Sequence, residues 1–293
     1  MIGFLLGLPA VQHAFIAASL VAVVSGVLGP FVITRHAAFA VHGVSELSFT
    51  GAAAGLLLFD DALLGAILGS LVVATAIAGL GARDHERDAA IGVTLAFGLG
   101  VGVYLLGLMH NFASQATRLL FGQIFGVSTT EIWVLVGIAV GVLAVTLVIY
   151  RPLLFASVDP ELAQARGVPV RLVGLVFLVL LALTVTEAAQ IVGTTLVLCL
   201  VITPAAAAHR LSASPLVVTA VSVVIALVAA DGGILTSLAV DVTPSVPITT
   251  ISFGLYLVSR VVGARLRPRR RARPAVASGA ATVRGGREQV DPA

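Results

Sequence analysis

The chain contains no lysine, because all 17 of its basic residues are arginine. A Walker A phosphate-binding loop requires Gly-Lys-Ser/Thr, so this chain cannot form one, and any ATP hydrolysis linked to its activity must come from a partner chain. The sequence also lacks a Ser/His/Asp or Cys/His arrangement with supporting context. We therefore expect no enzymatic activity and no intrinsic cofactor.

Charged residues and cysteine are also scarce. Charged side chains make up only 11% of the 293 residues and hydrophobic ones 59%, a balance that a soluble globule could not carry on its surface. The single cysteine, Cys199, excludes an internal disulfide. Most of the net charge of +3 comes from the arginine-rich residues 265–273, which indicates membrane topology rather than nucleic-acid binding.

Nine apolar segments are long enough to cross the roughly 30 Å hydrocarbon core of a bilayer as helices. They lie near residues 11–33, 38–58, 62–81, 89–109, 131–150, 171–187, 189–209, 214–230 and 248–264. We predict an all-α, polytopic membrane protein with about eight or nine transmembrane helices in a domain of residues 1–264. Residues 265–293 mix Arg, Pro and Gly without hydrophobic periodicity, which predicts a basic, disordered cytoplasmic tail that contacts the lipid membrane.

The positions of the arginines predict which side of the membrane each loop faces. With the N-terminus outside, nearly all of them fall on the cytoplasmic side, and only Arg118 falls outside. This pattern predicts a multi-pass protein of the bacterial cytoplasmic membrane with its C-terminus in the cytoplasm. Two outer segments, 111–130 and 231–247, are apolar enough to be re-entrant or surface helices and are candidate docking or gating surfaces. Thr203-Pro204 should bend or interrupt the seventh span.

An imidazole and a carboxylate stand four residues apart in the second predicted span, at His42 and Glu46. Positions four apart share one helix face, and at about 1.5 Å per residue Glu46 lies roughly 16 Å beyond Arg35, near mid-bilayer. An acid there costs about 2.5–3.5 kcal/mol on insertion scales unless it is protonated, paired or beside water or metal. The donors suit zinc, manganese or ferrous iron. The pair is predicted to line a metal path, with a structural hydrogen bond between helices as the alternative.

Three further acids, Glu187, Asp231 and Asp241, are candidates for an outer gate. Glu187 is expected at the outer end of the sixth span or in the turn after it, and the two aspartates in the outer segment 231–247. The aspartates could attract cations or bind basic residues of an extracellular receptor. The alternative for Glu187 is an interfacial or paired carboxylate, because acids near span ends reach water at little cost.

The loop between the fifth and sixth predicted spans carries the signature of a short exposed helix. Asp159 can cap a helix that begins at Pro160, Glu161 adds negative charge to its first turn, and Gly167 ends it. In this Asp-x-Glu-x-Ala-x-x-x-Gly segment the chain resembles the zinc, manganese and iron branch of the ABC importer permeases. The resemblance implies that Asp159, Glu161, Ala163 and Gly167 dock in a groove of an ATPase subunit.

The resemblance extends over residues 11–264. It includes LFGQIFGVS (120–128), QIVGTTLVLCLVITPAAAA (190–208) and the segment 241–245, and a gapless match of residues 35–46 to Arg-Arg-x-Ala-Phe-x-Gly-Asp-Ala-x-Ser-His, with Gly51 five positions beyond. His42 stands where the family pattern has Asp, and Glu46 where it has His. The pair is therefore exchanged in type and unchanged in spacing.

The family implies a fold like that of type II ABC importers and a specific set of partners. These are an ATP-binding subunit, an extracytoplasmic metal-binding receptor protein and a second copy of the permease. The favoured function is the import of Zn2+ or Mn2+, with iron also open. The alternatives are a permease for metal chelates or a vitamin, an ion-gradient-driven transporter in which Glu46 and Glu187 relay protons, and a membrane scaffold without transport.

Overall fold

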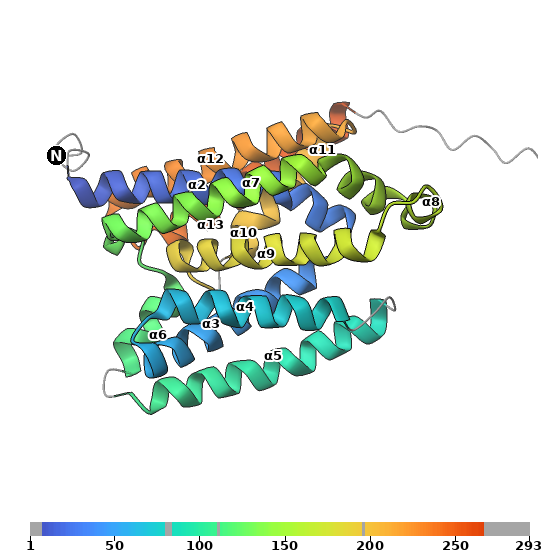
Figure 1. Cartoon of the computed structure of the whole chain (residues 1–293). Coiled ribbons are helices and arrows are strands. Elements are labelled where there is room, and N and C mark those ends of the chain that lie inside the picture. The colour runs from blue at the N-terminus through green and yellow to red at the C-terminus, as the bar shows by residue number, and fades with distance from the viewer. Residues whose placement is uncertain (1–7, 80–83, 110–111, 195–196, 267–293) are drawn as a thin grey trace, which may run out of the picture.

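The computed structural model describes residues 8–79, 84–109, 112–194 and 197–266, and every regular element within them is a helix (Figure 1). The predicted all-α class is confirmed, while most of the predicted tail, 265–293, lies outside the described residues. The elements are, in chain order, α2 (Pro9–Thr34), α3 (Ala38–Phe59), α4 (Ala62–Gly79), α5 (Asp84–Gly107), α6 (Phe112–Phe121), η1 (Ile124–Gly126), α7 (Thr129–Val158), α8 (Pro160–Ala165), α9 (Val170–Val192), α10 (Val197–Val201), α11 (Thr203–Leu211), α12 (Pro215–Val240) and α13 (Ser245–Leu266).

Seven of the described helices are long and apolar enough to cross a membrane, namely α2, α3, α4, α7, α9, α12 and α13. Two shorter apolar helical stretches, Ile91–Gly107 within α5 and Val197–Leu211 across α10 and α11, overlap the other two of the nine predicted segments. The second of these is broken, because α10 ends at Val201 and α11 begins at Thr203. The predicted interruption at Thr203-Pro204 is therefore confirmed.

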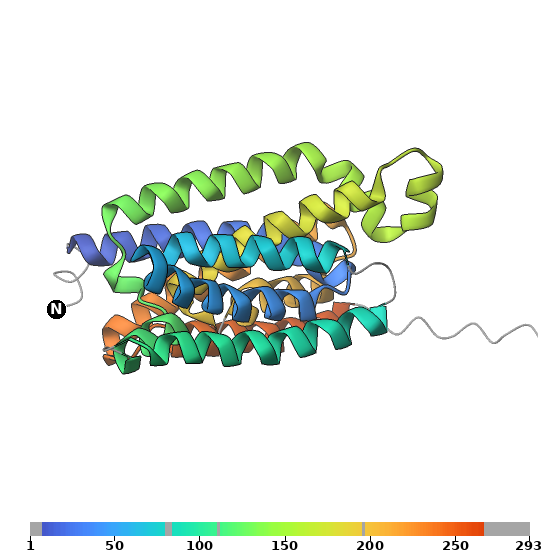
Figure 2. The ribbon, with the colours of Figure 1, turned by 60° about the horizontal axis from the view of Figure 1, so that its bottom comes forward.

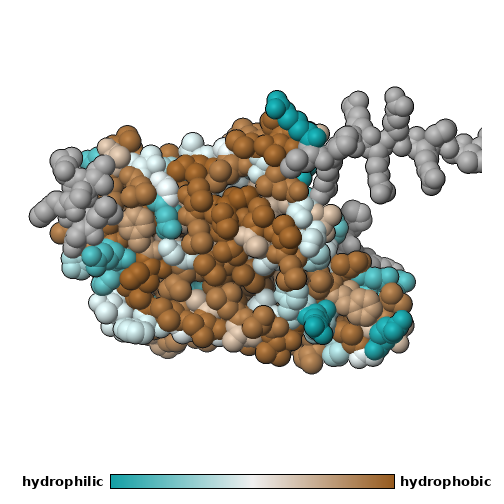
Figure 3. Space-filling model, turned by 90° about the horizontal axis from the view of Figure 1, so that it is seen from above, coloured by the Kyte–Doolittle hydropathy of each residue, from teal (hydrophilic) through white to brown (hydrophobic). Residues whose placement is uncertain are grey.

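The outer surface of the bundle is apolar where a bilayer would cover it. On α7, Leu147 is 78% exposed and Val148 81% exposed. Figure 3 shows apolar side chains over the middle of one face and hydrophilic ones closer to its two ends. Such a band is what hydrocarbon requires, and in water it would be a large adhesive patch.

The helices form two packed groups joined by α9. In the first group α3 packs against α4 and α5, and in the second α2 packs against α12 and α7. Helix α9 contacts α2, α3, α4 and α7, and its residues Leu181, Ala182 and Val185 are fully buried. This central position makes α9 the element through which the two groups are held together.

The hairpin of α3 and α4 is built on four glycines. A Cβ atom on Gly51 would collide with the backbone of Gly65, and one on Gly55 would lie 2.6 Å from the Cα of Gly65. A Cβ on Gly69 would lie 2.8 Å from the Cα of Gly51. Small residues let two membrane helices approach to backbone contact, where van der Waals packing is greatest. This packing fixes α3, which carries His42 and Glu46.

At the end of the bundle where α6 lies, three distant segments meet through backbone atoms. Gly122 and Gly193 have φ angles of +74° and +94°, and a Cβ on either one would collide with the segment of the other. The Ser245 hydroxyl donates to the carbonyl oxygens of Phe121, at 2.9 Å, and Val192, at 3.2 Å. We call Gly122, Gly193 and Ser245 the outer junction, because the sequence predicts that this end of the bundle faces outside.

Three predicted spans end five residues or more too early, and the three errors have the same cause. Helix α7 continues to Val158 rather than ending at residue 150, α9 continues to Val192 rather than 187, and α12 continues to Val240 rather than 230. In each case a charged residue inside the helix (Arg151, Glu187 or Asp231) wrongly predicts the end of the span. The segment 111–130, in contrast, does contain helical structure, α6 and η1.

Candidate functional site

The residues predicted to line a metal path lie together on α3. His42 and Glu46 are both half-buried and are close enough to interact electrostatically. The Nδ1 atom of His42 is buried and has no hydrogen-bond partner among the described residues. An imidazole nitrogen is a common metal ligand, and no hydrogen bond from the described residues competes for this one.

The contacts of α3 with its neighbours leave the face with this pair partly open. On one side Thr50 Oγ1 donates to the Gly98 carbonyl of α5 at 2.6 Å, and on the other Ser45 Oγ donates to the Thr194 carbonyl at 2.8 Å. At 3.6 residues per turn, His42 and Glu46 project between these two contacts. Toward the other end of α3, Phe49 and Ala53 cluster with Leu106 of α5. The polar pair therefore lies on the part of α3 that this chain does not cover completely.

One chain supplies only part of a metal site. Among the described residues, no group of three or more His, Cys, Asp or Glu side chains is close enough to hold a metal ion. His42 and Glu46 thus offer one nitrogen and one carboxylate. Two protein ligands bind weakly, which suits an ion that must also leave.

Glu187 does not lie at the end of a span, as predicted, but inside α9, five residues before its last residue, Val192. Its side chain is 1% exposed, and neither carboxylate oxygen has a hydrogen-bond partner among the described residues. It is not an interfacial acid. The preceding residue, Thr186, meets Ser48 of α3, with 3.5 Å between their hydroxyl oxygens.

The two aspartates of the predicted outer gate differ in their surroundings. Asp231 lies inside α12, where its Oδ1 accepts a hydrogen bond from Ser19 Oγ of α2 at 3.1 Å, so the predicted loop position is wrong. Asp241 caps the end of α12 with a left-handed backbone, φ +57°, and is exposed. Only Asp241 is placed where arriving molecules could meet it.

The predicted cytoplasmic helix is present as α8 and is capped as expected. Asp159 Oδ1 accepts the backbone N–H of Leu162 at 2.9 Å, Pro160 occupies the first turn, and Gly167 has a φ angle of +83°. Ala163 is fully buried, so it anchors α8 to its own chain, and Glu161 is exposed. Figure 2 shows the segment between α7 and α9 projecting beyond the helices of the bundle.

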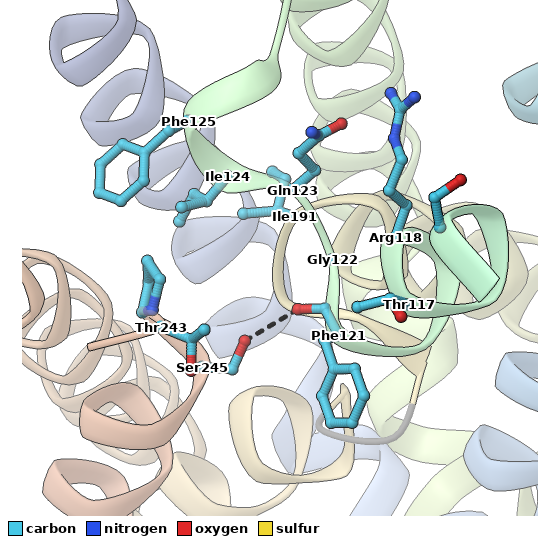
Figure 4. A pocket seen from close by; sticks show the side chains of 12 residues that line it. Thr117, Arg118, Phe121, Gly122, Gln123, Ile124, Phe125, Ile191, Thr243 and Ser245 are labelled. Atoms are coloured by element: carbon cyan, nitrogen blue, oxygen red, sulfur yellow. Dashed lines mark hydrogen bonds between the residues drawn. The ribbon is translucent and has the colours of Figure 1, made fainter. Parts of the chain in front are cut away.

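A cavity of about 720 Å3 lies beside the outer junction (Figure 4). Its walls come from the α6–η1 segment, Ile191 of α9 and residues 243–245 before and at the start of α13. Arg118 and Gln123 lie at one edge of it, across from Thr243 and Ser245. Both segments that the sequence indicated for docking or gating therefore contribute to one cavity.

A cluster around Arg35 was not found by sequence reasoning. The Nε of Arg35 donates to Ser157 Oγ at 2.9 Å, and its guanidinium carbon lies 5.2 Å from the ring centre of Phe177. The sequence marks Arg35 as a cytoplasmic charge and as the first residue of the family pattern at 35–46, and neither indicates these contacts. Its partners are 122 and 142 positions away, and nothing in the local pattern indicates them.

The family model described as "ABC 3 transport family" matches residues 8–263. The manganese transport system membrane protein MntC of Halalkalibacterium halodurans is 30% identical over 249 residues, 85% of each chain. The high-affinity zinc uptake system membrane protein ZnuB of Haemophilus influenzae is 26% identical over 248 residues, 84% of this chain and 95% of the relative.

Among solved structures, one chain of "PsaBC from Streptococcus pneumoniae in complex with Fab" matches with a TM-score of 0.80 and 28% identity. The match covers 89% of this chain and 96% of that chain. The likeness thus extends over nearly the whole bundle and is not restricted to one motif.

Proposed function

Because this chain belongs to the ABC 3 transport family, we propose that it is the membrane permease subunit of an ATP-driven importer for a divalent transition metal ion, Mn2+ or Zn2+. The named relatives act in manganese transport and zinc uptake. A separate subunit binds and hydrolyses ATP, since a chain without lysine has no Walker A loop. The metal is the cargo and not a resident cofactor.

One observation carries the assignment of cargo: His42 and Glu46 face the same way inside a membrane span, on a face of α3 that the chain leaves partly open. Ionisable residues within spans are rare, and they mark substrate or ion pathways, proton relays or voltage sensors. An imidazole with a carboxylate is a donor set for zinc, manganese or ferrous iron, because these ions accept both nitrogen and oxygen.

The incomplete ligand set supports a permease dimer. A second copy related by a twofold axis would bring a second His42 and a second Glu46 to the same axis, which makes four ligands from two weak pairs. The open side of α3 would then line the path between the two copies. Each chain alone offers the metal too few ligands. The dimer offers enough ligands to bind the ion, yet weakly enough to release it.

The two ends of the bundle have different partners in this proposal. The end with α8 is cytoplasmic, since Arg35, Arg166 and Arg210 lie at helix ends there, and the start of α2 lies at the opposite, outer end (Figure 1). Helix α8 docks on the ATPase subunit through its exposed side, which includes Asp159, Glu161 and Gly167, while the buried Ala163 holds α8 against its own chain. The complex belongs in a bacterial cytoplasmic membrane.

The outer cavity is the proposed docking place of the extracytoplasmic receptor protein. It lies at the end opposite α8, has an apolar floor of Phe121, Ile124 and Phe125, and carries the exposed Arg118 at its edge. Asp241 is exposed at the end of α12 and belongs to the same outer surface. Glu187 is enclosed by helices, so a role in gating would require those helices to part, whereas Asp231 is half-buried and bonded to Ser19.

The proposal is tested by reconstituting the permease in lipid vesicles with and without its ATPase subunit and measuring uptake of free Mn2+ and Zn2+. We expect uptake only with the ATPase and ATP. Uptake by the permease alone would sink the ATP-coupled mechanism. Uptake that stops when a proton gradient is collapsed, with ATP maintained, would favour a secondary transporter, and uptake of chelates but not free ions would change the cargo.

A further inference from the structure

Arg35 holds together three helices at the end of the bundle where α8 lies. It is the residue after α2, and its Nε donates to Ser157 Oγ near the end of α7 at 2.9 Å. Its guanidinium also lies over the Phe177 ring of α9, 5.2 Å from the ring centre. A Cβ on Gly174 of α9 would be 3.7 Å from Arg35 Nη1, so the same group rests against the α9 backbone.

These contacts lie on the two helices that flank α8 in the chain, near the end of α7 and near the start of α9. Ser157 lies two residues before Asp159, the cap of α8, and its own hydroxyl donates to the Leu153 carbonyl at 2.6 Å. The hydroxyl proton of Ser157 is therefore used in a hydrogen bond within α7, and its oxygen accepts the hydrogen bond from Arg35 Nε. Gly174 and Phe177 lie in the first turns of α9, on the other side of α8 in the chain. Arg35 thus contacts the base of the projecting segment on both sides.

Along the polypeptide chain, Arg35 is joined to α3 by a very short turn. Ala37 donates its N–H to the Val32 carbonyl at 2.8 Å, and His36 takes a left-handed backbone with φ +52°. Helix α3 begins at Ala38, so His42 follows about one helical turn later. Because this turn is so short, a displacement of Arg35 is passed on to α3 instead of being absorbed by flexible chain.

We propose that Arg35 is the positioning residue that transmits movement of α8 to α3, and so couples ATP hydrolysis by the partner to the movement of metal past His42 and Glu46. This inference rests on the proposed function. The ATPase moves α8, the bases of α7 and α9 move with it, and the guanidinium carries that movement into the α2–α3 turn. Coupling between distant sites can be carried by packed side chains and rigid elements, and here the Arg35 side chain joins α7 and α9 to the α2–α3 turn.

The chemistry of arginine suits this place better than that of lysine. A planar guanidinium can donate through Nε to a hydroxyl and stack its face on an aromatic ring at the same time. A lysine ammonium is a point charge on a flexible stem and cannot hold both contacts in one geometry. Arg35→Lys therefore keeps the charge and removes the link.

The experiment uses the full complex of permease, ATPase and receptor in lipid vesicles, and measures Mn2+ or Zn2+ uptake and ATP hydrolysis in the same sample. The variants are Arg35→Gln, Arg35→Lys and Ser157→Ala. The control is Arg210→Gln, which changes an exposed arginine at the same end of the bundle. In both Arg35 variants we expect ATP hydrolysis to continue while the number of metal ions moved per ATP falls at least about fivefold. A change of about fivefold is the low end of the usual effect of coupling between two sites. Ser157→Ala should lower the same ratio, and Arg210→Gln should not.

The outcomes separate the inference from the proposed function. An unchanged ratio in Arg35→Gln overturns the link, and so does a proportional loss of uptake and hydrolysis in an assembled complex, because that would place Arg35 in ATPase docking. If Arg35→Gln fails to fold, Ser157→Ala and Phe177→Leu decide by the same ratio. A wild-type complex that hydrolyses ATP and moves no metal overturns the proposed function itself.

Discussion

Ser19 of α2 donates a hydrogen bond from its Oγ to Oδ1 of Asp231 on α12, over 3.1 Å. The two residues are 212 positions apart, and both lie within membrane-spanning helices. The contact gives an intramembrane acid a donor and ties the first long helix of the chain to one of its last. Asp231 therefore serves the packing of α2 on α12.

The first prediction concerns this pair. Ser19→Ala leaves the half-buried Asp231 carboxyl without this donor, and a typical intramolecular hydrogen bond contributes about 0.5–1.5 kcal/mol of net stability. We expect a lower unfolding temperature of the purified protein in detergent. Ser19→Thr keeps the hydroxyl and is the control. A Ser19→Ala protein as stable as the wild type would show that the bond adds nothing.

The exchanged metal pair gives a second prediction. His42→Ala and Glu46→Gln should each lower metal uptake by at least about tenfold, because even partners behind a metal ligand contribute that much to affinity. The double variant His42→Asp, Glu46→His restores the family order on the same helix face, and we expect it to transport. Uptake by vesicles containing the complex, at equal protein levels, is the measurement. Full uptake by both single variants would remove the pair from the path.

Helix α8 gives a third prediction. Gly167 has φ +83°, and Ala in that conformation costs about 1–2 kcal/mol. Gly167→Ala should loosen the end of α8 and reduce the amount of ATPase subunit that copurifies with the permease. Gly137→Ala is the matched control, since Gly137 lies in α7 with no atom within 4 Å of an added Cβ. Equal copurification for the two variants would contradict the proposed docking role.

The glycine hairpin gives a fourth prediction. Gly55→Leu places side-chain atoms where Gly65 already lies, and overpacking of this kind costs about 1–3 kcal/mol or more. Thermal unfolding should begin at a lower temperature, and metal uptake should fall because α3 is displaced. Gly100→Leu on α5 meets open space and should behave as the wild type does. Similar effects at both positions would mean that α3 and α4 do not touch through backbone.

The buried acid of α9 gives a fifth prediction. Neither oxygen of Glu187 has a partner among the described residues, and an unsatisfied buried polar group costs about 1–3 kcal/mol. Glu187→Leu should therefore raise the unfolding temperature, while Asp60→Asn at an exposed turn should leave it unchanged. A lower unfolding temperature for Glu187→Leu would show that the carboxyl has a stabilising partner in the folded protein.

The sequence predicted those parts of the structure that depend on local chemistry. The α8 segment was predicted to the residue, because Asp159, Pro160 and Gly167 act within their own turn. The apolar segments were found because hydrocarbon demands long uncharged runs. The spacing of His42 and Glu46 placed them on one face without knowledge of any neighbour.

The errors came from acids that are satisfied or enclosed by distant residues. Asp231 and Glu187 were assigned to loops or span ends because an intramembrane carboxylate was expected to seek water. Asp231 instead finds Ser19 across the bundle, and Glu187 is enclosed by α9 and its neighbours. The partners of Arg35 were missed for the same reason, since tertiary contacts leave no trace in local periodicity.

The outer junction has a consequence for the speed of movement at that end. Gly122 and Gly193 meet through main-chain atoms, so no rotation about a side-chain bond can part them. Side-chain rotamers turn within picoseconds to nanoseconds, whereas segments that shift as bodies take microseconds to milliseconds. Any parting of α6 from α9 at this junction therefore belongs to the slower class and cannot follow from the fast fluctuations of single residues.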